Sequence, residues 1–280
     1  MSKIYKNILN SQSPMIIGIL NVTPDSFSDG GKFVCVETAV THALELLKDG
    51  ADIIDVGGES SRPGAKPISD DEELSRVIPI IEEVIIRKPK TIISIDTTKA
   101  KVAEAALKAG ATIVNDISGG TFDRKMFEVV AKYKVPIIIM HIQGKPKTMQ
   151  KAPTYKNVVE EVYKYLEDKI IVAKGFNIEE IIVDPGIGFG KRVFENYELL
   201  KNINYFKKLN YPVLVGLSKK SFLGKVLNLK IDERENATTI AETFAIINGA
   251  NIIRTHNVKN ANQIKSLYSF VNNPTQLKNV

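Results

Sequence analysis

Short apolar runs recur along the chain, and polar residues or glycine follow each of them. The runs lie at residues 15–20, 53–56, 91–95, 112–114, 136–140, 181–183, 212–217 and 252–253. Runs of this length predict buried β-strands. They are continuous rather than alternating, which is typical of strands that are covered on both faces.

Helix-like stretches separate these runs. At 36–48 apolar residues recur at helical spacing, and Gly50 is suited to end the helix. The same step recurs as DGADII at 49–54, AGATIV at 109–114 and NGANII at 248–253. Each is a helix stop followed by a strand start, which predicts a repeated αβ step. We therefore expect a polar N-terminal lead-in on the surface at 1–14 and a single (β/α)8 TIM barrel at 15–280. An open, doubly wound sheet is the alternative.

Polar side chains follow nearly every predicted strand. Asp55 lies within the second run, just before Gly57, and the residues that follow the other runs are Asn21, Asp96, Asn115, Asp116, His141, Asp184, Ser218, Lys219, Lys220, Arg254 and His256. In a barrel these positions converge at the C-terminal mouth, where such folds keep their active sites. We therefore expect an active site there. Asp55, Asp116 and His141 are either part of its chemistry or hydrogen-bonded support, and we favour support.

Composition narrows the function further. The chain has 280 residues, 44% hydrophobic and 25% charged, as in an ordinary globular protein. The net charge of +6 comes from scattered lysines, which favours a solvated surface and anionic small-molecule substrates over nucleic acid. The single cysteine, Cys35, excludes an intramolecular disulfide and a multi-cysteine metal site. No segment reads as a signal peptide or a membrane span, so we expect a cytoplasmic protein without a membrane partner.

Several familiar catalytic motifs fail on inspection. DPGIGFGK at 184–191 has Pro185 where a phosphate loop needs glycine, so its glycines are better suited to backbone passing close to a flat ligand beside Asp184 and Phe189. GLSKKS at 216–221 has Lys220 where a nucleophile elbow needs glycine. The three histidines lack zinc-site spacing. Covalent serine catalysis and a zinc centre are thus disfavoured.

The mouth residues themselves suggest a ligand with two chemically different ends. Asp96, Asn115 and Asp184 would accept hydrogen bonds from a heterocycle rich in N–H groups, to which Lys220 would donate. Ser61, Arg254 and His256 suit a diphosphate, and Asn21 offers a hard oxygen to a magnesium ion that enters with it. The loops at 21–31 and 57–65 would close over the mouth and exclude water.

Taken together, the motifs resemble those of dihydropteroate synthase, in that family's order and along nearly the whole chain. They are NVTPDSFSDGG at 21–31, GGESSRPGA at 57–65, SIDTTK at 94–99, NDISGG at 115–120, MHIQGKPKTMQ at 140–150, DPGIGFGK at 184–191, GLSKKSFLG at 216–224 and IIRTHNV at 252–258. The resemblance implies a (β/α)8 enzyme of folate biosynthesis, usually a homodimer. Such an enzyme joins a pterin methyl diphosphate to p-aminobenzoate and releases diphosphate in a dissociative step that uses Mg²⁺.

The resemblance also implies roles for individual residues. The pterin would be bound by Asp96, Asn115, Asp184, Phe189 and Lys220. The diphosphate would be bound by Asn21, Ser61, Arg254 and His256, with Asn21 also a ligand of the metal. The p-aminobenzoate pocket would be lined by Phe27, Ser61, Pro63 and Ser221. The groups that act in catalysis would be Asp29, Arg62, Lys220, Arg254 and His256.

The sequence departs from the family at four positions. Ser61, Lys145, Lys219 and Asn257 stand where threonine, threonine, arginine and aspartate are common. Ser61 loses a methyl group beside the p-aminobenzoate and sulfonamide pocket, and Asn257 touches the support of His256. Two other interpretations remain, a pterin-binding methyltetrahydrofolate methyltransferase and a paralogue that binds pterin without turnover.

Overall fold

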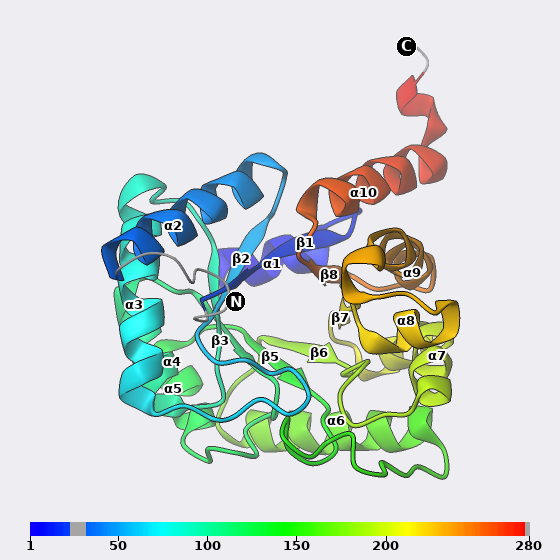
Figure 1. Cartoon of the computed structure of the whole chain (residues 1–280), viewed down its shortest axis with the longest axis horizontal. Coiled ribbons are helices and arrows are strands. Elements are labelled where there is room, and N and C mark those ends of the chain that lie inside the picture. The colour runs from blue at the N-terminus through cyan, green and yellow to red at the C-terminus, as the bar shows by residue number, and fades with distance from the viewer. Residues whose placement is uncertain (23–31, 278–280) are drawn as a thin grey trace.

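The computed structural model describes residues 1–22 and 32–277, and its centre is a barrel of eight parallel strands (Figure 1). These are β1 (Met15–Asn21), β2 (Ile53–Gly57), β3 (Ile93–Asp96), β4 (Ile113–Asp116), β5 (Ile137–Met140), β6 (Ile181–Asp184), β7 (Leu214–Gly216) and β8 (Ile252–Thr255). Strands β1 to β6 pair in chain order, and β8 lies between β1 and β7. A bridge from Val183 to Val213 joins β6 to β7 and closes the barrel. The expected fold class is confirmed, and the open sheet is excluded.

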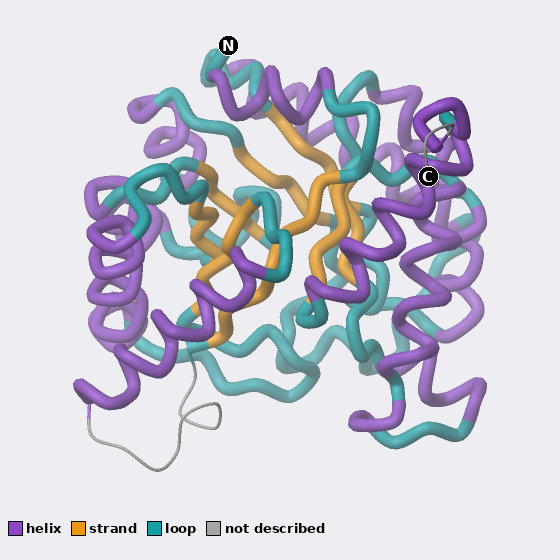
Figure 2. Tube along the Cα trace, turned by 90° about the horizontal axis from the view of Figure 1, so that it is seen from above, coloured by secondary structure: helices purple, strands orange, loops and turns teal. Residues whose placement is uncertain are grey.

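Helices surround the strands in both views (Figures 1 and 2). They are α2 (Lys32–Lys48), α3 (Asp70–Arg87), α4 (Ala100–Ala109), α5 (Met126–Tyr133), α6 (Val158–Gly175), α7 (Val193–Lys201), α8 (Ser221–Leu227), α9 (Glu235–Ile247) and α10 (Val258–Asn272), with short 3-10 turns η2 (Ile203–Leu209), η3 (Ile231–Glu233) and η4 (Pro274–Leu277). The main hydrophobic core lies between this ring and the outer face of the barrel. The helix expected at 36–48 begins four residues earlier, at Lys32.

The repeated αβ step is visible in the backbone. Gly50, Gly110 and Gly249 all have positive φ, at 105°, 118° and 100°. The next residue in each case donates its N–H to the carbonyl five residues back, as Ala51 does to Leu46 at 3.0 Å. This is the left-handed helix ending for which glycine is preferred. Each copy then leads directly into a barrel strand.

The first 14 residues differ from the surface lead-in that the sequence suggested. They contain helix α1 (Lys3–Asn10), which begins at an N-cap, Ser2. Tyr5 and Ile8 are only 3% exposed and pack against the apolar residues inside the barrel. The Tyr5 hydroxyl also donates to Ile181 O at 2.7 Å. Helix α1 therefore covers the end of the barrel opposite the long loops (Figure 2).

Most strands extend further than their apolar runs. Strands β3, β4 and β6 end on the polar residues Asp96, Asp116 and Asp184, which the runs leave out. The backbone of each of these residues is paired with a neighbouring strand at the mouth of the barrel. The ladder thus reaches into the site, and the polar residues are fixed by strand geometry.

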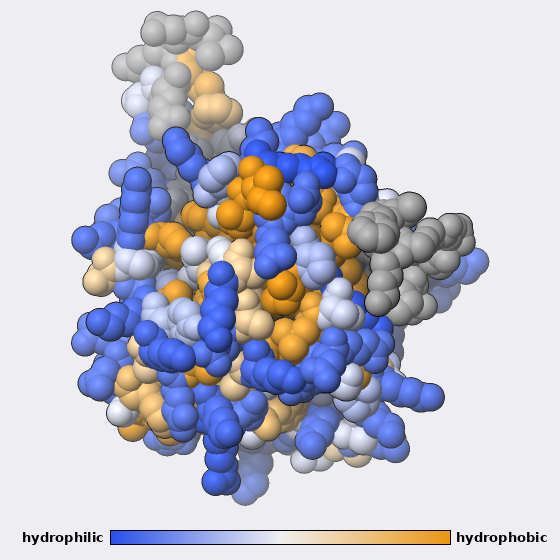
Figure 3. Space-filling view, turned by 90° about the vertical axis from the view of Figure 1, so that its left-hand side faces the viewer, coloured by the Kyte–Doolittle hydropathy of each residue, from blue (hydrophilic) through white to orange (hydrophobic). Residues whose placement is uncertain are grey.

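The face on the α2 and α3 side carries both polar and apolar side chains. Figure 3 shows the hydrophilic side chains projecting around this face, with the apolar ones among them. In the part of the chain that the structure describes, no helix combines the length and the apolar character needed to cross a membrane.

Candidate active site

Alternate residues of the strands point into the barrel and form two tiers. The lower tier is apolar and packs against α1; it contains Ile17, Ile53, Ile113, Ile138, Ile182, Leu214 and Ile252. The upper tier lies two residues further along each strand, since side chains on one face of a strand recur with period two. Here Asp55, Asn115, Asp184 and Arg254 replace the apolar residues. The intervening residues belong to the outer core. A polar tier therefore rests on an apolar floor.

Arg254 is paired with Asp55 of this tier and with Asp96 at the end of β3. Its Nε donates to Asp55 Oδ2 at 2.6 Å, and its Nη2 donates to Asp96 Oδ2 at 2.7 Å. Asp55 also accepts hydrogen bonds from the Asn115 amide, at 3.1 Å, and from the Ser94 hydroxyl. Asp55 is fully buried, and the hydrogen-bond partners of its carboxylate among the described residues are all on other barrel strands. It therefore orients Arg254 and Asn115 and does not face a ligand.

Within the described residues, the carboxyl of Asp96 makes fewer hydrogen bonds than that of Asp55: it accepts one from Arg254. Burial raises the pKa of Asp96 to about 7, although Arg254 acts in the opposite direction. Near neutral pH its carboxyl is therefore divided between neutral and ionised forms. A ligand N–H placed against it would favour the ionised form, because a hydrogen bond to a carboxylate stabilises its charge.

Lys220 reaches from the end of β7 to the loop after β6. Its Nζ donates to Ile187 O at 2.6 Å and lies 4.0 Å from the centre of the Phe189 ring. In the same loop, Asp184 accepts a hydrogen bond from Gly186 N at 2.7 Å. Burial lowers the pKa of Lys220 to about 7 and raises that of Asp184. A donor, an acceptor and an aromatic face are thus grouped at one position, as a flat heterocycle with polar edges requires.

Lys191 is a residue to which the sequence analysis gave no role. Its side chain is buried, and Nζ donates to Gly186 O at 2.8 Å and Phe189 O at 3.0 Å. The same Nζ lies 2.9 Å from His141 Nδ1. Burial, followed by the charge of Lys191, lowers the pKa of His141 to about 2, so the imidazole is neutral and accepts this bond. Lys191 and His141 therefore hold the loop after β6 in place. A lysine closing a glycine-rich segment was the only signal of this role.

Asn21 and His256 form a second polar group at the mouth. Asn21 Nδ2 lies 3.3 Å from His256 Nε2, and His256 Nδ1 lies 2.9 Å from Ser218 Oγ. Burial, with the nearby charge of Arg254, lowers the pKa of His256 to about 3. The ring is therefore neutral, with Nδ1 donating to Ser218 and Nε2 accepting from Asn21.

The residues present fit a magnesium ion only if most of its ligands come from elsewhere. The side-chain nitrogen of Asn21 contacts His256, and its Oδ1 accepts no hydrogen bond from the described residues. This oxygen is therefore available to a ligand. Within that same part of the chain, no group of three His, Cys, Asp or Glu side chains is placed to hold a metal. One amide oxygen suits Mg²⁺, which usually keeps several waters and binds through substrate phosphates.

Asp116 accepts hydrogen bonds from the turn that directly follows it. Its Oδ1 accepts from the Ser118 N–H and hydroxyl, at 2.8 and 2.7 Å, and its Oδ2 accepts from Gly120 N at 2.8 Å. These bonds fold the NDISGG turn after β4. Asp116 thus supports the turn beside Asn115.

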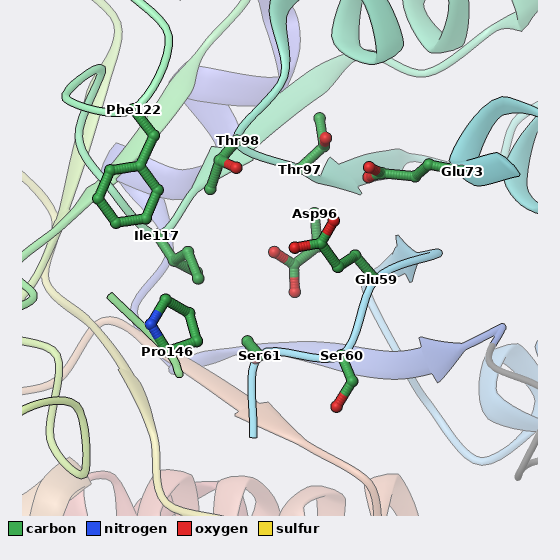
Figure 4. Close-up of a pocket in the computed structure, with 10 residues that line it drawn as sticks. All are labelled: Glu59, Ser60, Ser61, Glu73, Asp96, Thr97, Thr98, Ile117, Phe122 and Pro146. Atoms are coloured by element: carbon green, nitrogen blue, oxygen red, sulfur yellow. The ribbon is translucent and has the colours of Figure 1, made fainter. Parts of the chain in front are cut away.

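A pocket opens beside Asp96, between β3 and the loops after β2, β4 and β5 (Figure 4). Carboxylates and hydroxyls line one side, and the apolar residues Ile117, Phe122 and Pro146 line the other. Ser61, expected at the diphosphate, lies here. It shares the pocket with Asp96 and so lies close to the barrel tier.

The other expected site residues are more peripheral. Arg62 and Pro63 are exposed, and Ser221 is the first, exposed residue of α8. Among the described residues, no hydrogen bond joins these three to Arg254 or His256. Phe27 and Asp29 lie outside the described residues. The structure thus brings together the expected heterocycle-binding groups and leaves the p-aminobenzoate set incomplete.

Comparison with known proteins places this geometry in context. The model of the pterin-binding enzyme family matches residues 17–256. The dihydropteroate synthase of Synechocystis is 46% identical over 254 residues, which cover 89% of this chain and 87% of that protein.

Solved structures of dihydropteroate synthases share the fold of this chain. Xanthomonas albilineans dihydropteroate synthase with 4-aminobenzoic acid has a TM-score of 0.88 and 38% identity, covering 94% of both chains. A Yersinia pestis dihydropteroate synthase in complex with a sulfonamide drug has a TM-score of 0.87 and 38% identity, covering 93% of this chain and 94% of that one.

Proposed function

The chain belongs to the dihydropteroate synthase family of pterin-binding enzymes, and from this we propose how its residues carry out that family's reaction. It is a transferase that condenses (7,8-dihydropterin-6-yl)methyl diphosphate with p-aminobenzoate to give 7,8-dihydropteroate and diphosphate. The observation that carries the assignment is one hydrogen-bonded group at the barrel mouth, in which Asp55 joins Asn115 to Arg254, and Arg254 bonds in turn to Asp96.

The pterin end of the substrate would lie over this tier. Asp96 and Asp184 would accept hydrogen bonds from ring N–H groups, and Asn115 would add an amide. Lys220 would exchange its bond to Ile187 O for an acceptor on the ring, while Phe189 covers a ring face. Because these groups lie on strands or are held by Lys191, they need little rearrangement to bind, which favours affinity.

The diphosphate end would be bound by Arg254, His256, Asn21 and Ser61. Arg254 already neutralises two carboxylates, so it contributes donors more than net charge. His256 is neutral in the free protein, with its proton on Nδ1, so Nε2 would donate to the diphosphate only after Asn21 releases it and a proton reaches it. We propose Mg²⁺ as the cofactor, with Asn21 as its protein ligand; when bound, it would neutralise charge on the diphosphate oxygens.

In the reaction the bond between the methylene carbon and the diphosphate oxygen breaks, and the electron pair leaves with diphosphate. Arg254, Ser61 and His256 stabilise that developing negative charge. The electron-rich pterin would tolerate the cationic methylene, and we expect Asp29, which lies outside the described residues, to contribute. The amine of p-aminobenzoate then forms the new C–N bond and loses a proton to water. No protein nucleophile is required.

We place p-aminobenzoate against Ser61, Pro63, Ser221 and Phe27, with Arg62 entering from the loop at 57–65. Sulfonamides resemble p-aminobenzoate in shape and would compete for this site. Ser61 lies in the pocket beside Asp96, which supports a position next to the pterin methylene.

The assignment is tested with purified protein, Mg²⁺, the pterin diphosphate and p-aminobenzoate. We expect stoichiometric release of diphosphate and formation of dihydropteroate, both dependent on p-aminobenzoate. Omitting p-aminobenzoate is the control. Absence of diphosphate release, or turnover of methyltetrahydrofolate instead, would contradict the proposal.

We further propose that the enzyme is a cytoplasmic homodimer. Exposed apolar side chains gather on neighbouring helices α7, α9 and α10, and on α8 where it meets the following turn; they include Phe194, Val226, Leu227, Ile240, Phe244, Ile247 and Leu267. A surface of this kind commonly marks a protein interface. Light scattering should give twice the chain mass, and Phe244→Glu should reduce it. The single cysteine suits a reducing compartment, which cell fractionation would test.

A further inference from the structure

The loop after β2 carries Ser61, Arg62 and Pro63, and one side chain ties its two ends together. Glu59 Oε2 accepts the backbone N–H of Ile68 at 3.3 Å, which closes the intervening residues into a compact loop. The same oxygen accepts a hydrogen bond from Lys99 Nζ at 2.5 Å. Glu59 therefore defines the shape of the loop and also fixes it to the barrel.

Lys99 provides the connection to the barrel. It is the N-cap residue of α4, three positions after Asp96. Besides Glu59, its Nζ contacts Glu73 Oε2 of α3 at 2.6 Å. Burial lowers the pKa of Lys99, but its bonds to Glu59 and Glu73 outweigh this and raise it, so the side chain stays charged. The loop, α3 and the strand that carries Asp96 thus meet at one ammonium group.

The burial of Glu73 indicates that these ion pairs do more than stabilise the packing of the helices. Its side chain is 1% exposed, and its Oε1 has no hydrogen-bond partner among the described residues. Glu73 and Glu59 both line the pocket that also contains Ser61 and Asp96 (Figure 4). A buried ion pair is a weak source of stability, because desolvation offsets the attraction between the charges. A second pair, Lys101 with Asp71, joins the same two helices at the exposed surface.

Two further contacts determine where the loop lies. Arg76 Nη1 donates to Gly58 O at 2.7 Å, and an added Cβ on Gly58 would lie 2.8 Å from Val77, so the start of the loop is pressed against α3. Near the tip, Gly64 N donates to Pro146 O at 3.2 Å, across the pocket. The backbone is held at its start and near its tip, and Glu59 supplies the only side-chain bond within the described residues that joins its two ends.

We propose that Glu59, Lys99 and Glu73 form a positioning triad that holds the 59–68 loop over the pocket beside Asp96. The triad sets the placement of Ser61 and Pro63 against p-aminobenzoate. In this role the three side chains act on p-aminobenzoate through the position of the loop, and none of them is assigned a bond to the substrate. The inference rests on the proposed function. It goes further, because it predicts that a misplaced loop weakens the binding of p-aminobenzoate and leaves the binding of the pterin nearly unchanged.

Glu59→Gln is the sharpest test, because it keeps the shape of the side chain and leaves Lys99 paired with buried Glu73. We expect KM for p-aminobenzoate to rise about tenfold, equivalent to about 1.4 kcal/mol. The Kd of a pterin without diphosphate should change less than about twofold, since its contacts lie on the strands and on the loop after β6. Hydrogen exchange should quicken at the amides of residues 60–68 and stay unchanged in α4.

Lys101→Met is the matched control. It breaks the exposed Lys101–Asp71 pair between the same two helices and should leave every kinetic constant unchanged. Lys99→Met should raise KM as Glu59→Gln does, and Lys99→Arg should restore part of the loss by keeping the charge. This rescue is what a positioning role requires.

The possible outcomes separate this inference from the proposed function. If the wild-type protein releases no diphosphate, the proposed function fails. If the wild-type protein is active but Glu59→Gln has unchanged KM for p-aminobenzoate, the positioning triad is refuted alone. An equal loss of pterin and p-aminobenzoate affinity together with a lower melting temperature would also refute it, because that pattern indicates a purely structural role.

Discussion

At the scale of single residues, burial makes the charged forms of Asp96 and Lys220 less stable in the folded protein than they are in water. Burial raises the pKa of one to about 7 and lowers that of the other to about 7. For Asp96 the folded protein retains a proton that the unfolded chain loses, so its contribution to stability falls as pH rises from about 4 to 7. For Lys220 the unfolded chain binds the proton more tightly, so stability rises with pH above 7. A ligand that pairs with both side chains relieves both penalties.

The affinity for a pterin without diphosphate should therefore peak near pH 7. Protonation of Asp96 removes an acceptor on the acid side, and deprotonation of Lys220 weakens a donor on the alkaline side; the apparent pKa values belong to the pair. Calorimetric titration at several pH values would show the two limbs. Asp96→Asn should weaken binding and flatten the acid limb. A Kd that stays constant across this range would contradict the assignment.

Among the described glycines, Gly186 leaves the least room for a side chain. Its φ is +66°, and an added Cβ would lie 1.9 Å from His141 O, a backbone atom. Gly186→Ala should therefore displace the loop that carries Ile187 and Phe189, and lower kcat/KM by about tenfold or more. Gly175→Ala, where a Cβ meets nothing within 4 Å, is the control for the substitution itself. Steady-state kinetics of both variants decides, and wild-type values for Gly186→Ala would be inconsistent with a tightly fitted loop.

The residue scale also shows the limit of what the sequence predicted. Asp96, Asn115 and Asp184 were identified because each follows an apolar run, and strand geometry alone then brings them together. Lys191 and Lys99 were not assigned roles, since their partners are backbone carbonyls or side chains distant in sequence. Contacts of that kind leave no periodic trace in the chain.

At the scale of elements, helix α1 was hard to predict because its sequence pattern is weak. Ile4, Tyr5 and Ile8 are its apolar residues that reach the barrel interior, in a segment that is otherwise polar. Their spacing fits a helix, but a helix this short does not stand out by composition. The eight strands were predictable because each coincides with a short, mainly apolar run, interrupted only at Asp55 in β2 and Ser94 in β3. Their mouth ends were not, because the ladder continues through polar residues whose side chains turn inward.

Tyr5→Ala should lower the free energy of unfolding by about 3–5 kcal/mol, the usual cost of removing a large buried ring. It also removes the hydroxyl that bonds to Ile181 O. Because α1 lies at the far end of the barrel from the mouth, kcat should stay within about twofold at a temperature where the variant is folded. Urea denaturation measures the first quantity. Leu9→Ala, on the same helix but 46% exposed, is the control and should cost much less. Equal losses in the two variants would mean that α1 is not packed as described.

At the scale of the whole molecule, charge and substrate match. The net charge is +6, and basic residues lie in loops after several strands, among them Arg62, Lys145 and Lys220. Lys145 Nζ lies 5.7 Å from the centre of the Phe122 ring, at the edge of the pocket beside Asp96. Both proposed substrates are anions, so the field of the protein would raise the rate at which they reach the mouth.

We expect kcat/KM for the pterin diphosphate to fall several-fold as salt rises from about 0.01 to about 0.3 M, because screening shortens the reach of that field. Binding of an uncharged pterin serves as the control and should vary little. Steady-state assays at constant pH and Mg²⁺ would measure both. A flat profile for the diphosphate substrate would show that short-range contacts alone govern capture.

The two tiers of the barrel interior separate folding from chemistry within single strands. An isoleucine that secures the floor and a carboxylate or guanidinium that meets the ligand are often only two positions apart. Protein engineers therefore have a scaffold whose upper layer is open to redesign for another ring system, provided that the aliphatic base beneath it is left alone. Divergence toward new substrates in nature would find the same route.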